Sequence, residues 1–353
     1  MPRILLTQAI HPLAHARMAQ LGEVVVAPDT SADTLRHCAL GCDVVVVRAQ
    51  LPNDIFDASP SLIGAVRHGA GVDMIPIDAA TARGVLVANV PGVNATSVAE
   101  HVLRSMFQLA RRSAAMSAQL RSEGSAGWAR ARALADPGFE LAGRTVGLIG
   151  YGHVGQAIAR MCSLGLAMQV LTHTRSALTD GKAWAKREQL PELLQRSDFV
   201  VLACPLTPQT RGLIGVSQLA LMRPDAFLIN VARGPVVQEA ALLEALRANR
   251  LAGAALDVFD IQPLPAHHPY WHMEQVLITP HVAGITADSM LRMGYAAAQA
   301  VEQLLQGKVP SNCINPQAEE AWREHIASLL RTGLAQSWRP IGLQPFEPWS
   351  TKR

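Results

Sequence analysis

The chain has 353 residues, 49% of them hydrophobic and 17% charged, which is enough for two domains with well-buried cores. Its 31 basic and 28 acidic residues are spread along the chain and leave a net charge of +3, so nucleic acids and membrane surfaces are poor candidates for a partner. Five cysteines without a CxxC pair, no signal-peptide core and no run of roughly 20 apolar residues predict a cytoplasmic protein with reduced thiols and no metal site.

Short β-branched runs alternate with stretches of helical period along the chain. Ten runs are predicted to be strands: 3–7, 23–27, 42–48, 85–89, 145–150, 168–173, 198–204, 226–232, 253–259 and 275–279. Strands that are apolar throughout and alternate with helices are typical of parallel sheets covered on both faces. Because the runs fall into two groups, the sequence predicts an α/β fold with two doubly wound parallel-sheet lobes.

Two long helical stretches connect and complete these lobes. The first, 97–121, is expected to link them, and the second, after Gly284, has small residues suited to packing back on the first lobe. We therefore expect a discontinuous domain made of residues 1–96 and 285–353, with residues 97–284 forming a second domain inserted in it. From about residue 317 the tail is predicted to be a short helix followed by an extended arm.

The string GLIGYGHVGQAIA places Gly150, Gly152 and Gly155 in a G-x-G-x-x-G pattern, directly after a predicted strand and at the start of a predicted helix. The glycines permit a tight turn and let backbone N–H groups approach a pyrophosphate at the positive end of the helix. In this context the pattern predicts a dinucleotide site, which includes His153 and Val154 in the first helical turn.

The next predicted strand ends in His173, Thr174, Arg175 and Ser176. NAD-specific sites carry an acidic residue here, about 20 residues after the glycines, which binds the ribose hydroxyls. A carboxylate would repel a 2′-phosphate, whereas hydroxyls and a guanidinium would bind one. The sequence therefore favours NADP as the cofactor, with NAD as the second option.

Two residues of catalytic type follow predicted strands of the second lobe. Arg233 occurs in NVARGPVV and His281 occurs in ITPHVAG. An arginine can bind a carboxylate with two parallel hydrogen bonds, and a histidine can exchange the proton of a carbinol near neutral pH. Since open α/β sheets bind ligands at the carboxyl ends of their strands, the two residues together indicate an active site.

Taken together, these motifs resemble those of the D-isomer-specific 2-hydroxyacid dehydrogenase family. The resemblance covers about residues 40–316, through HGAGVDMIPIDAATARGVLVANVPGVNATSVAEH, GRTVGLIGYGHVGQAIA, PLTPQTRGLI, LINVARGPVV, AGAALDVF and TPHVAG. It implies a Rossmann cofactor domain inserted in a flavodoxin-like substrate domain. It also implies hydride transfer between NAD(P) and a small 2-keto or 2-hydroxy acid, such as hydroxypyruvate or glyoxylate, by a homodimer built through the cofactor lobe.

The resemblance implies roles for residues on the substrate side. Arg233 would bind the carboxylate and carbonyl of the substrate, and His281 would be the acid–base. The backbone at Ala70 and Gly71 would hold the carboxylate. Arg48 matches an arginine of relatives that take phosphorylated acids, and two interpretations stay open for it: contact with a distal anion, or exposure to solvent.

The resemblance also implies contacts with the cofactor. Asp257, in AGAALDVF, would contact the nicotinamide carboxamide. Cys204, Pro205 and Thr210 would line the adenosine side. Further contacts are expected from residues at the strand ends, namely Val231, Ala232 and Gly284.

One position departs from the family pattern. The family usually reads DVFxxEP, with a glutamate that hydrogen-bonds the catalytic histidine, whereas this chain reads DVFDIQP with Gln262. A glutamine can accept the Nδ1–H of His281 and orient the ring, but it has no charge to stabilise the imidazolium. We therefore expect a lower His281 pKa than in a glutamate-bearing relative. Asp260 should point elsewhere, and His267 and His268 should be turn residues.

Gln262 also leaves two alternative functions open. Formate dehydrogenases of this family pair a glutamine with the catalytic histidine, because formate oxidation requires no proton transfer, and Asn94 is compatible with such a site. Loss of the glutamate is also compatible with a catalytically weakened protein that senses dinucleotides. The presence of both Arg233 and His281 favours an enzyme over a sensor.

Overall fold

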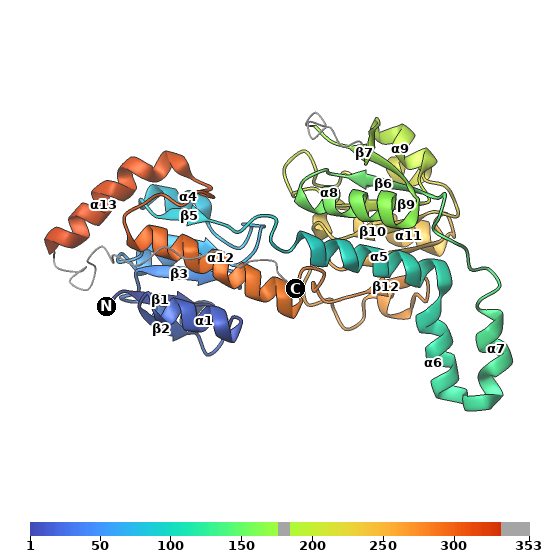
Figure 1. The fold of residues 1–353 in the computed structure, drawn as a ribbon, viewed down its shortest axis with the longest axis horizontal. Helices are drawn as coiled ribbons and strands as arrows, with labels where there is room; N and C mark the ends of the chain where they lie inside the picture. Colours follow the sequence, from blue (N-terminus) through green and yellow to red (C-terminus); the bar gives the residue numbers. More distant parts are fainter. Residues whose placement is uncertain (176–183, 333–353) are drawn as a thin grey trace. The chain divides into compact units, whose positions relative to one another are not determined.

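The computed structural model describes residues 1–175 and 184–332 (Figure 1). It consists of two compact units. The first unit is Met1–Val93 with the described chain from Thr286 on, and the second unit is Asn94–Ile285. Each unit has one parallel sheet with helices on both faces, which confirms the predicted α/β class.

The sheet of the first unit has the strand order β2-β1-β3-β4-β5, which is the flavodoxin-like order. Its strands are β1 (Arg3–Leu6), β2 (Glu23–Val26), β3 (Val44–Val47), β4 (Gly64–Arg67) and β5 (Leu86–Ala88). One face packs against α1 (Pro12–Ala19), α12 (Ala287–Leu305) and α13 (Glu319–Thr332). The other face packs against α2 (Ala32–Ala39), α3 (Ile55–Ala58) and α4 (Ile77–Ala82).

The sequence did not predict β4, although it lies between β3 and β5 in the sheet. Its four residues, GAVR, include only one β-branched side chain and begin with a glycine. A Cβ at Gly64 would lie 2.4 Å from Cδ1 of Leu304 in α12. The glycine therefore serves the close packing of α12, and pairing with β3 and β5 outweighs its low strand propensity.

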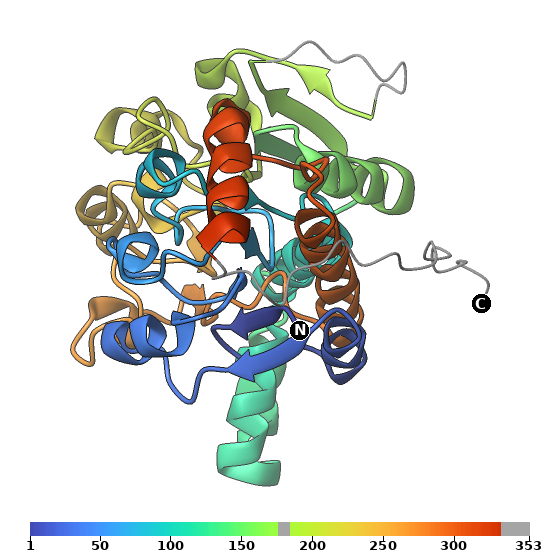
Figure 2. The same ribbon diagram turned by 90° about the vertical axis from the view of Figure 1, so that its left-hand side faces the viewer.

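Helix α12 packs back on the first unit, as expected. It lies beside α1 in Figures 1 and 2, where a Cβ at Gly294 would be 2.3 Å from Cβ of Ala14. In α13, the fully buried Trp322 donates its indole N–H to the carbonyl oxygen of Ile63 at 2.9 Å. The short helix expected after residue 317 is thus part of this core, and the predicted arm lies outside the described residues.

The sheet of the second unit has the order β12-β11-β10-β9-β6-β7-β8, a Rossmann order that changes direction between β6 and β9. Its strands are β6 (Thr145–Ile149), β7 (Gln169–His173), β8 (Lys186–Arg187), β9 (Phe199–Leu202), β10 (Phe227–Asn230), β11 (Gly253–Leu256) and β12 (Val276–Ile278). One face packs against α5 (Ala95–Arg111) and α8 (His153–Arg160). The other packs against α9 (Leu190–Arg196), α10 (Val216–Leu221) and α11 (Glu239–Arg247).

The helical stretch predicted over residues 97–121 is divided into two helices. The chain forms α5 and then α6 (Ser113–Glu123), because Arg112 adopts a left-handed conformation with φ of 50°. The side-chain oxygen of Gln108 accepts hydrogen bonds from the Ser113 hydroxyl at 2.9 Å and from the Ala114 amide at 3.0 Å, which satisfies the start of α6. With α7 (Trp128–Ala133), α6 forms a hairpin that extends from α5 (Figure 1).

None of the helices in the described part of the chain is both long and apolar enough to cross a membrane.

Candidate active site

The glycine turn between β6 and α8 has the geometry that its sequence pattern predicts. Gly150 has φ of 105°, and a Cβ there would lie 2.6 Å from the carbonyl oxygen of Ala203. A Cβ at Gly155 would lie 2.3 Å from the carbonyl oxygen of Gly150. Both positions therefore require glycine for strand, turn and helix to meet.

The N-terminus of α8 is open. Gly152 is its N-cap, and a Cβ added there would meet no atom of the described residues within 4 Å. In the first turn His153 is exposed and Val154 is half-buried. The turn leaves room for an anion at the positive end of the helix, so these residues fit the pyrophosphate of a dinucleotide.

The end of β7 carries the residues expected to distinguish NADP from NAD. His173 and Thr174 are half-buried and Arg175 is exposed, while Ser176 lies outside the described residues. Burial raises the pKa of the Cys204 thiol after β9, whereas a backbone hydrogen bond and the charge of Arg175 lower it. The guanidinium therefore lies close enough to the end of β9 to act on a group there.

The loop after β9 is held by two threonines. The Thr210 hydroxyl donates to the carbonyl oxygen of Pro205 at 2.7 Å and accepts from the amide of Thr207 at 2.8 Å. The residues expected on the adenosine side, Cys204, Pro205 and Thr210, thus belong to one ordered loop beside the glycine turn.

Arg233 lies in a turn at the end of β10 that is shaped by Asn230. The buried Asn230 side chain accepts from the amide of Ala232 and donates to the carbonyl oxygen of Arg233, both at 3.0 Å. The half-buried Arg233 donates from Nη1 to the Ala232 carbonyl oxygen at 2.7 Å, and the amide of Val231 donates to β9. Asn230 is not among the residues predicted from the sequence, although an asparagine at a strand end is typical of such turns.

Gly234 brings the Arg233 turn against the loop that contains Gln262. A Cβ at Gly234 would lie 2.1 Å from the carbonyl carbon of Phe259 and 2.4 Å from the amide nitrogen of Asp260. Only a glycine allows this approach. The two loops expected to carry catalytic residues are therefore in direct backbone contact.

His281 has a left-handed backbone, with φ of 56°. For a residue other than glycine this conformation costs on the order of 1–3 kcal/mol and occurs mainly where the surroundings impose it. Its amide donates to the carbonyl oxygens of Asp257 at 2.8 Å and Thr279 at 3.0 Å. Its Nδ1 lies 3.0 Å from Oε1 of Gln262, so the expected contact between the two side chains is present.

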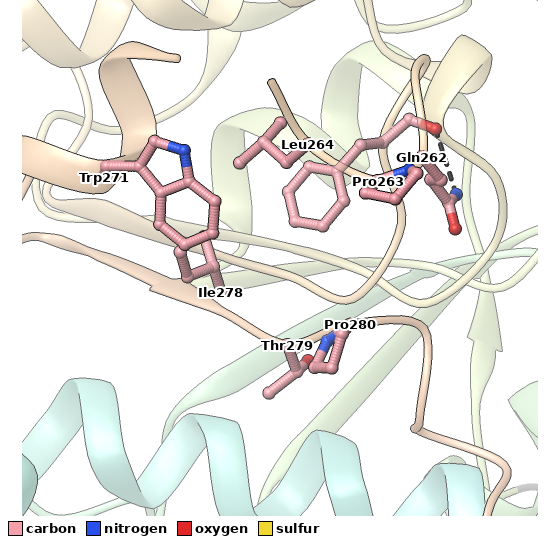
Figure 3. A pocket seen from close by; sticks show the side chains of 8 residues that line it. Gln262, Pro263, Leu264, Trp271, Ile278, Thr279 and Pro280 are labelled. Carbon is pink, nitrogen blue, oxygen red and sulfur yellow. Dashed lines mark hydrogen bonds between the residues drawn. The ribbon is translucent and has the colours of Figure 1, made fainter. Parts of the chain in front are cut away.

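The amide of Gln262 has a fixed orientation. Its Nε2 donates to the carbonyl oxygen of Phe259 at 3.1 Å, the bond drawn beside Gln262 in Figure 3. Rotating the amide by half a turn would bring two carbonyl oxygens together. Oε1 therefore faces His281 and accepts a hydrogen bond from Nδ1–H, so the expected acid–base role of this ring would fall to its other nitrogen, Nε2.

Asp257 is buried and holds the loop that presents His281. One carboxylate oxygen accepts from the Thr279 hydroxyl at 2.7 Å and the Val282 amide at 2.9 Å, and the other accepts from the Ala283 amide at 2.9 Å. Both oxygens are thus engaged inside the protein. The contact expected with a nicotinamide carboxamide would use their remaining lone pairs.

A pocket of about 610 Å³ lies beside Gln262. Its wall is mainly apolar and is formed by Phe259, Gln262, Pro263, Leu264, Trp271, Ile278, Thr279 and Pro280 (Figure 3). The indole of Trp271 and the side chains of Leu264 and Ile278 come together on one side of this pocket, away from the amide of Gln262.

The other polar residues of the same loop have different surroundings. His268 accepts from the Tyr270 amide at its Nδ1, and its Nε2 lies 3.1 Å from Glu239. Asp260 lines a separate small cavity with Glu239 and Tyr270, where burial and then the charge of Glu239 raise its pKa. His267 is exposed. Asp260 thus lines a different cavity, as expected, and the absence of a role for the two histidines in proton transfer stays a prediction.

The expected substrate residues of the first unit lie at the carboxyl ends of β3 and β4. Arg48 is half-buried and donates to the carbonyl oxygen of Ala9, and burial lowers its pKa. The carbonyl oxygen of Ala70 accepts from the Asn89 side chain at 2.7 Å, and that of Gly71 accepts from Arg67 at 2.9 Å. These bonds fix the loop by its oxygens, so a carboxylate would have to bind to its amide N–H groups.

The described residues contain no group of three or more His, Cys, Asp or Glu side chains placed to hold a metal ion. Burial raises the pKa of the Cys42 thiol to about 11, as expected for a thiol packed in a core.

Comparison with known proteins gives a consistent result. A family model described as D-isomer specific 2-hydroxyacid dehydrogenase, NAD binding domain, matches residues 103–283. The chain is 33% identical over 321 residues to D-3-phosphoglycerate dehydrogenase of Methanocaldococcus jannaschii, covering 89% of this chain but only 60% of that protein. It is 34% identical over 281 residues to glyoxylate/hydroxypyruvate reductase B of Salmonella agona, covering 79% of this chain and 84% of that protein.

The fold of this chain is also similar to that of a solved structure with bound ligands. The NADPH-dependent glyoxylate/hydroxypyruvate reductase of Sinorhizobium meliloti, in complex with NADP and malonate, matches with a TM-score of 0.77 and 28% sequence identity. The match covers 89% of this chain and 96% of that one.

Proposed function

Because the chain belongs to the D-isomer specific 2-hydroxyacid dehydrogenase family, we propose that it is an oxidoreductase that reduces a small 2-keto acid with NADPH. The observation that carries this proposal is the contact between Nδ1 of His281 and Oε1 of Gln262 at 3.0 Å. It orients the ring with Nδ1 toward Gln262, so that in the protonated ring the opposite nitrogen, Nε2, would give the proton. Hydroxypyruvate and glyoxylate are the first candidate substrates, since similar proteins are named as reductases of these acids.

A chain of contacts connects the proposed catalytic residues. Gly234 follows Arg233 and lies against the backbone of Phe259, whose carbonyl oxygen orients the amide of Gln262. Gln262 in turn orients His281. In the proposed reaction Arg233 binds the carboxylate and polarises the carbonyl, and His281 gives its Nε2 proton to the carbonyl oxygen. A bound nicotinamide would supply the hydride.

We propose NADP as the preferred cofactor. The exposed Arg175 after β7 and the hydroxyl of Thr174 are suited to a 2′-phosphate, and the open N-terminus of α8 is suited to the pyrophosphate. The similar reductase of Sinorhizobium meliloti is NADPH-dependent. Contacts with the cofactor by Cys204, Pro205 and Thr210, and by the strand-end residues Val231, Ala232 and Gly284, would complete this site.

We also propose that the second unit is the cofactor domain and the first unit the substrate domain of a cytoplasmic homodimer. Two features of the second unit support association through it. Phe107 of α5 is 45% exposed and Trp128 of α7 is 66% exposed, and α6 buries none of its residues. Sedimentation velocity tests the dimer, and a monomer at micromolar concentration would contradict it.

The second candidate function is formate oxidation. A neutral partner for the histidine suits a reaction without proton transfer, and Gln262 provides one. Asn94 lies close by in the same unit, since a Cβ at Gly284 would be 2.6 Å from its Nδ2. Keto-acid reduction fits the site better. Arg233 would bind the carboxylate of a 2-keto acid, and the oriented His281 would give a proton to its carbonyl oxygen.

A steady-state screen tests the proposed function. Purified protein is assayed with glyoxylate, hydroxypyruvate and larger 2-keto acids, each with NADPH and with NADH, and with formate and each oxidised cofactor. We expect turnover of at least one 2-keto acid, with kcat/KM about tenfold higher for NADPH, as one charge-assisted hydrogen bond to a phosphate would give. Turnover of formate alone would favour the second candidate, and cofactor binding without turnover would favour a dinucleotide sensor.

A further inference from the structure

Three separate sequence motifs meet behind the loop that carries His281. His101, on α5, comes from the motif NATSVAEH and had no predicted role. Its Nε2 lies 3.3 Å from the hydroxyl oxygen of Thr279, and that hydroxyl lies 2.7 Å from the carboxylate of Asp257. All three side chains belong to the second unit.

The direction of these hydrogen bonds follows from their chemistry. The Thr279 hydroxyl has a single proton, and the carboxylate of Asp257 can only accept, so this proton is directed to Asp257. The hydroxyl oxygen must then accept from His101, whose ring carries a proton on Nε2. Burial lowers the pKa of His101, with the charge of Asp257 opposing and that of Arg104 adding to the effect, which is consistent with a neutral ring.

The loop between β12 and Gly284 needs such support. His281 has a left-handed backbone, and Thr279 and Pro280 line the pocket of about 610 Å³ on one side of the loop. Packing is therefore incomplete on that side. On the other side, the carboxylate of Asp257 accepts hydrogen bonds from the Thr279 hydroxyl and from two loop amides. The carbonyl oxygen of Asp257 accepts a hydrogen bond from the amide of His281.

We propose that Thr279 and His101 are positioning residues for His281. Both act through Asp257 and hold the acid–base in its productive geometry. This inference rests on the proposed function, because it assigns the proton transfer to His281. It differs from a direct contact with the cofactor, since the hydrogen bonds of His101 and Thr279 run to each other and to Asp257.

Thr279→Val and Thr279→Ser form a matched pair of variants. Valine has nearly the shape of threonine but can neither donate to Asp257 nor accept from His101, whereas serine keeps the hydroxyl. Hydrogen–deuterium exchange of full-length protein, followed by mass spectrometry, reports on the loop whether or not the protein turns over a substrate. We expect about tenfold faster exchange of the peptide containing residues 280–284 in Thr279→Val, near wild-type exchange in Thr279→Ser, and no change in β6.

Steady-state kinetics gives the second measurement. Thr279→Val should lower kcat for the best 2-keto acid about tenfold or more with less than a threefold change in the KM for NADPH, and Thr279→Ser should restore most of kcat. His101→Gln provides a second variant, and adding it to Thr279→Val should cause little further loss, because both residues act through one hydrogen-bond chain.

Unchanged loop exchange in Thr279→Val would overturn the inference even if the wild type is active. A higher KM for NADPH with an unchanged kcat would also overturn it and would make the group a cofactor site. If wild type and variants turn over none of the acids, the proposed function fails, and the exchange data still decide whether the network holds the loop.

Discussion

Replacing Gln262 by glutamate would place a negative charge beside His281. The two side chains are joined at 3.0 Å between Oε1 and Nδ1. Two unit charges about 4 Å apart attract by about 1 kcal/mol in water and about 4 kcal/mol at an effective dielectric constant of 20. Since Gln262 is exposed and His281 is half-buried, the lower part of this range applies. Since one pKa unit corresponds to about 1.4 kcal/mol, this attraction in Gln262→Glu should raise the His281 pKa by about one unit.

A local contact limits this increase. The amide Nε2 of Gln262 donates to the carbonyl oxygen of Phe259 at 3.1 Å, and a carboxylate would present an oxygen there instead. Repulsion between the two oxygens would turn the carboxylate partly away from its present position. We therefore expect a shift of about one unit and not the larger value that a dielectric constant of 20 alone would give.

A higher His281 pKa should favour the two reaction directions at different pH. Keto-acid reduction needs protonated His281, so Gln262→Glu should extend the alkaline limb of kcat/KM to higher pH by about one unit. Alcohol oxidation needs the neutral ring, so its acid limb should also move up by about one unit, and the wild type should oxidise at lower pH than the variant. Asp260→Asn, which changes a charge directed into a different cavity, is the control and should leave both profiles in place. Superimposable wild-type and Gln262→Glu profiles would refute the reasoning.

Three further changes test other parts of the site. Arg233→Lys keeps the charge but loses the planar pair of donors, so the KM for the keto acid should rise about tenfold in steady-state assays; an unchanged KM would remove Arg233 from the substrate site. Arg175→Ala should lower kcat/KM for NADPH about tenfold and leave that for NADH unchanged, and equal losses with both cofactors would contradict a contact with the 2′-phosphate. Gly234→Ala should destabilise the protein by about 1–3 kcal/mol in thermal unfolding, because its Cβ would overlap the carbonyl group of Phe259, and an unchanged midpoint would contradict the close approach.

Much of the fold could be predicted from the sequence, because most strands are apolar and β-branched. The failures occur where tertiary contacts outweigh local preference. β4 pairs with β3 and β5 although it begins with a glycine, a residue of low strand propensity that here lets α12 pack closely. The break at Arg112 depends on Gln108 turning back to accept hydrogen bonds from the start of α6, whereas the helical period of the sequence continues through it.

The site was predictable in its residue types but not in its atoms. The motif around Gln262 indicated a partner for His281, and the structure brings the two side chains together. It could not indicate that the carbonyl oxygen of Phe259 fixes the amide, because a backbone atom has no sequence signal. His101 is far from Thr279 in the chain, so their contact follows only from the packing of α5 on the sheet. The roles assigned to these residues remain predictions.

The central claim is that His281 transfers the proton in the reduction of a 2-keto acid. Its most direct test compares wild type and His281→Asn in the oxidation of NADPH by the best acid of the screen, with NADPH binding measured separately by fluorescence. We predict that His281→Asn binds NADPH as the wild type does but loses about 10²- to 10⁴-fold in kcat. A variant with wild-type kcat would contradict the claim.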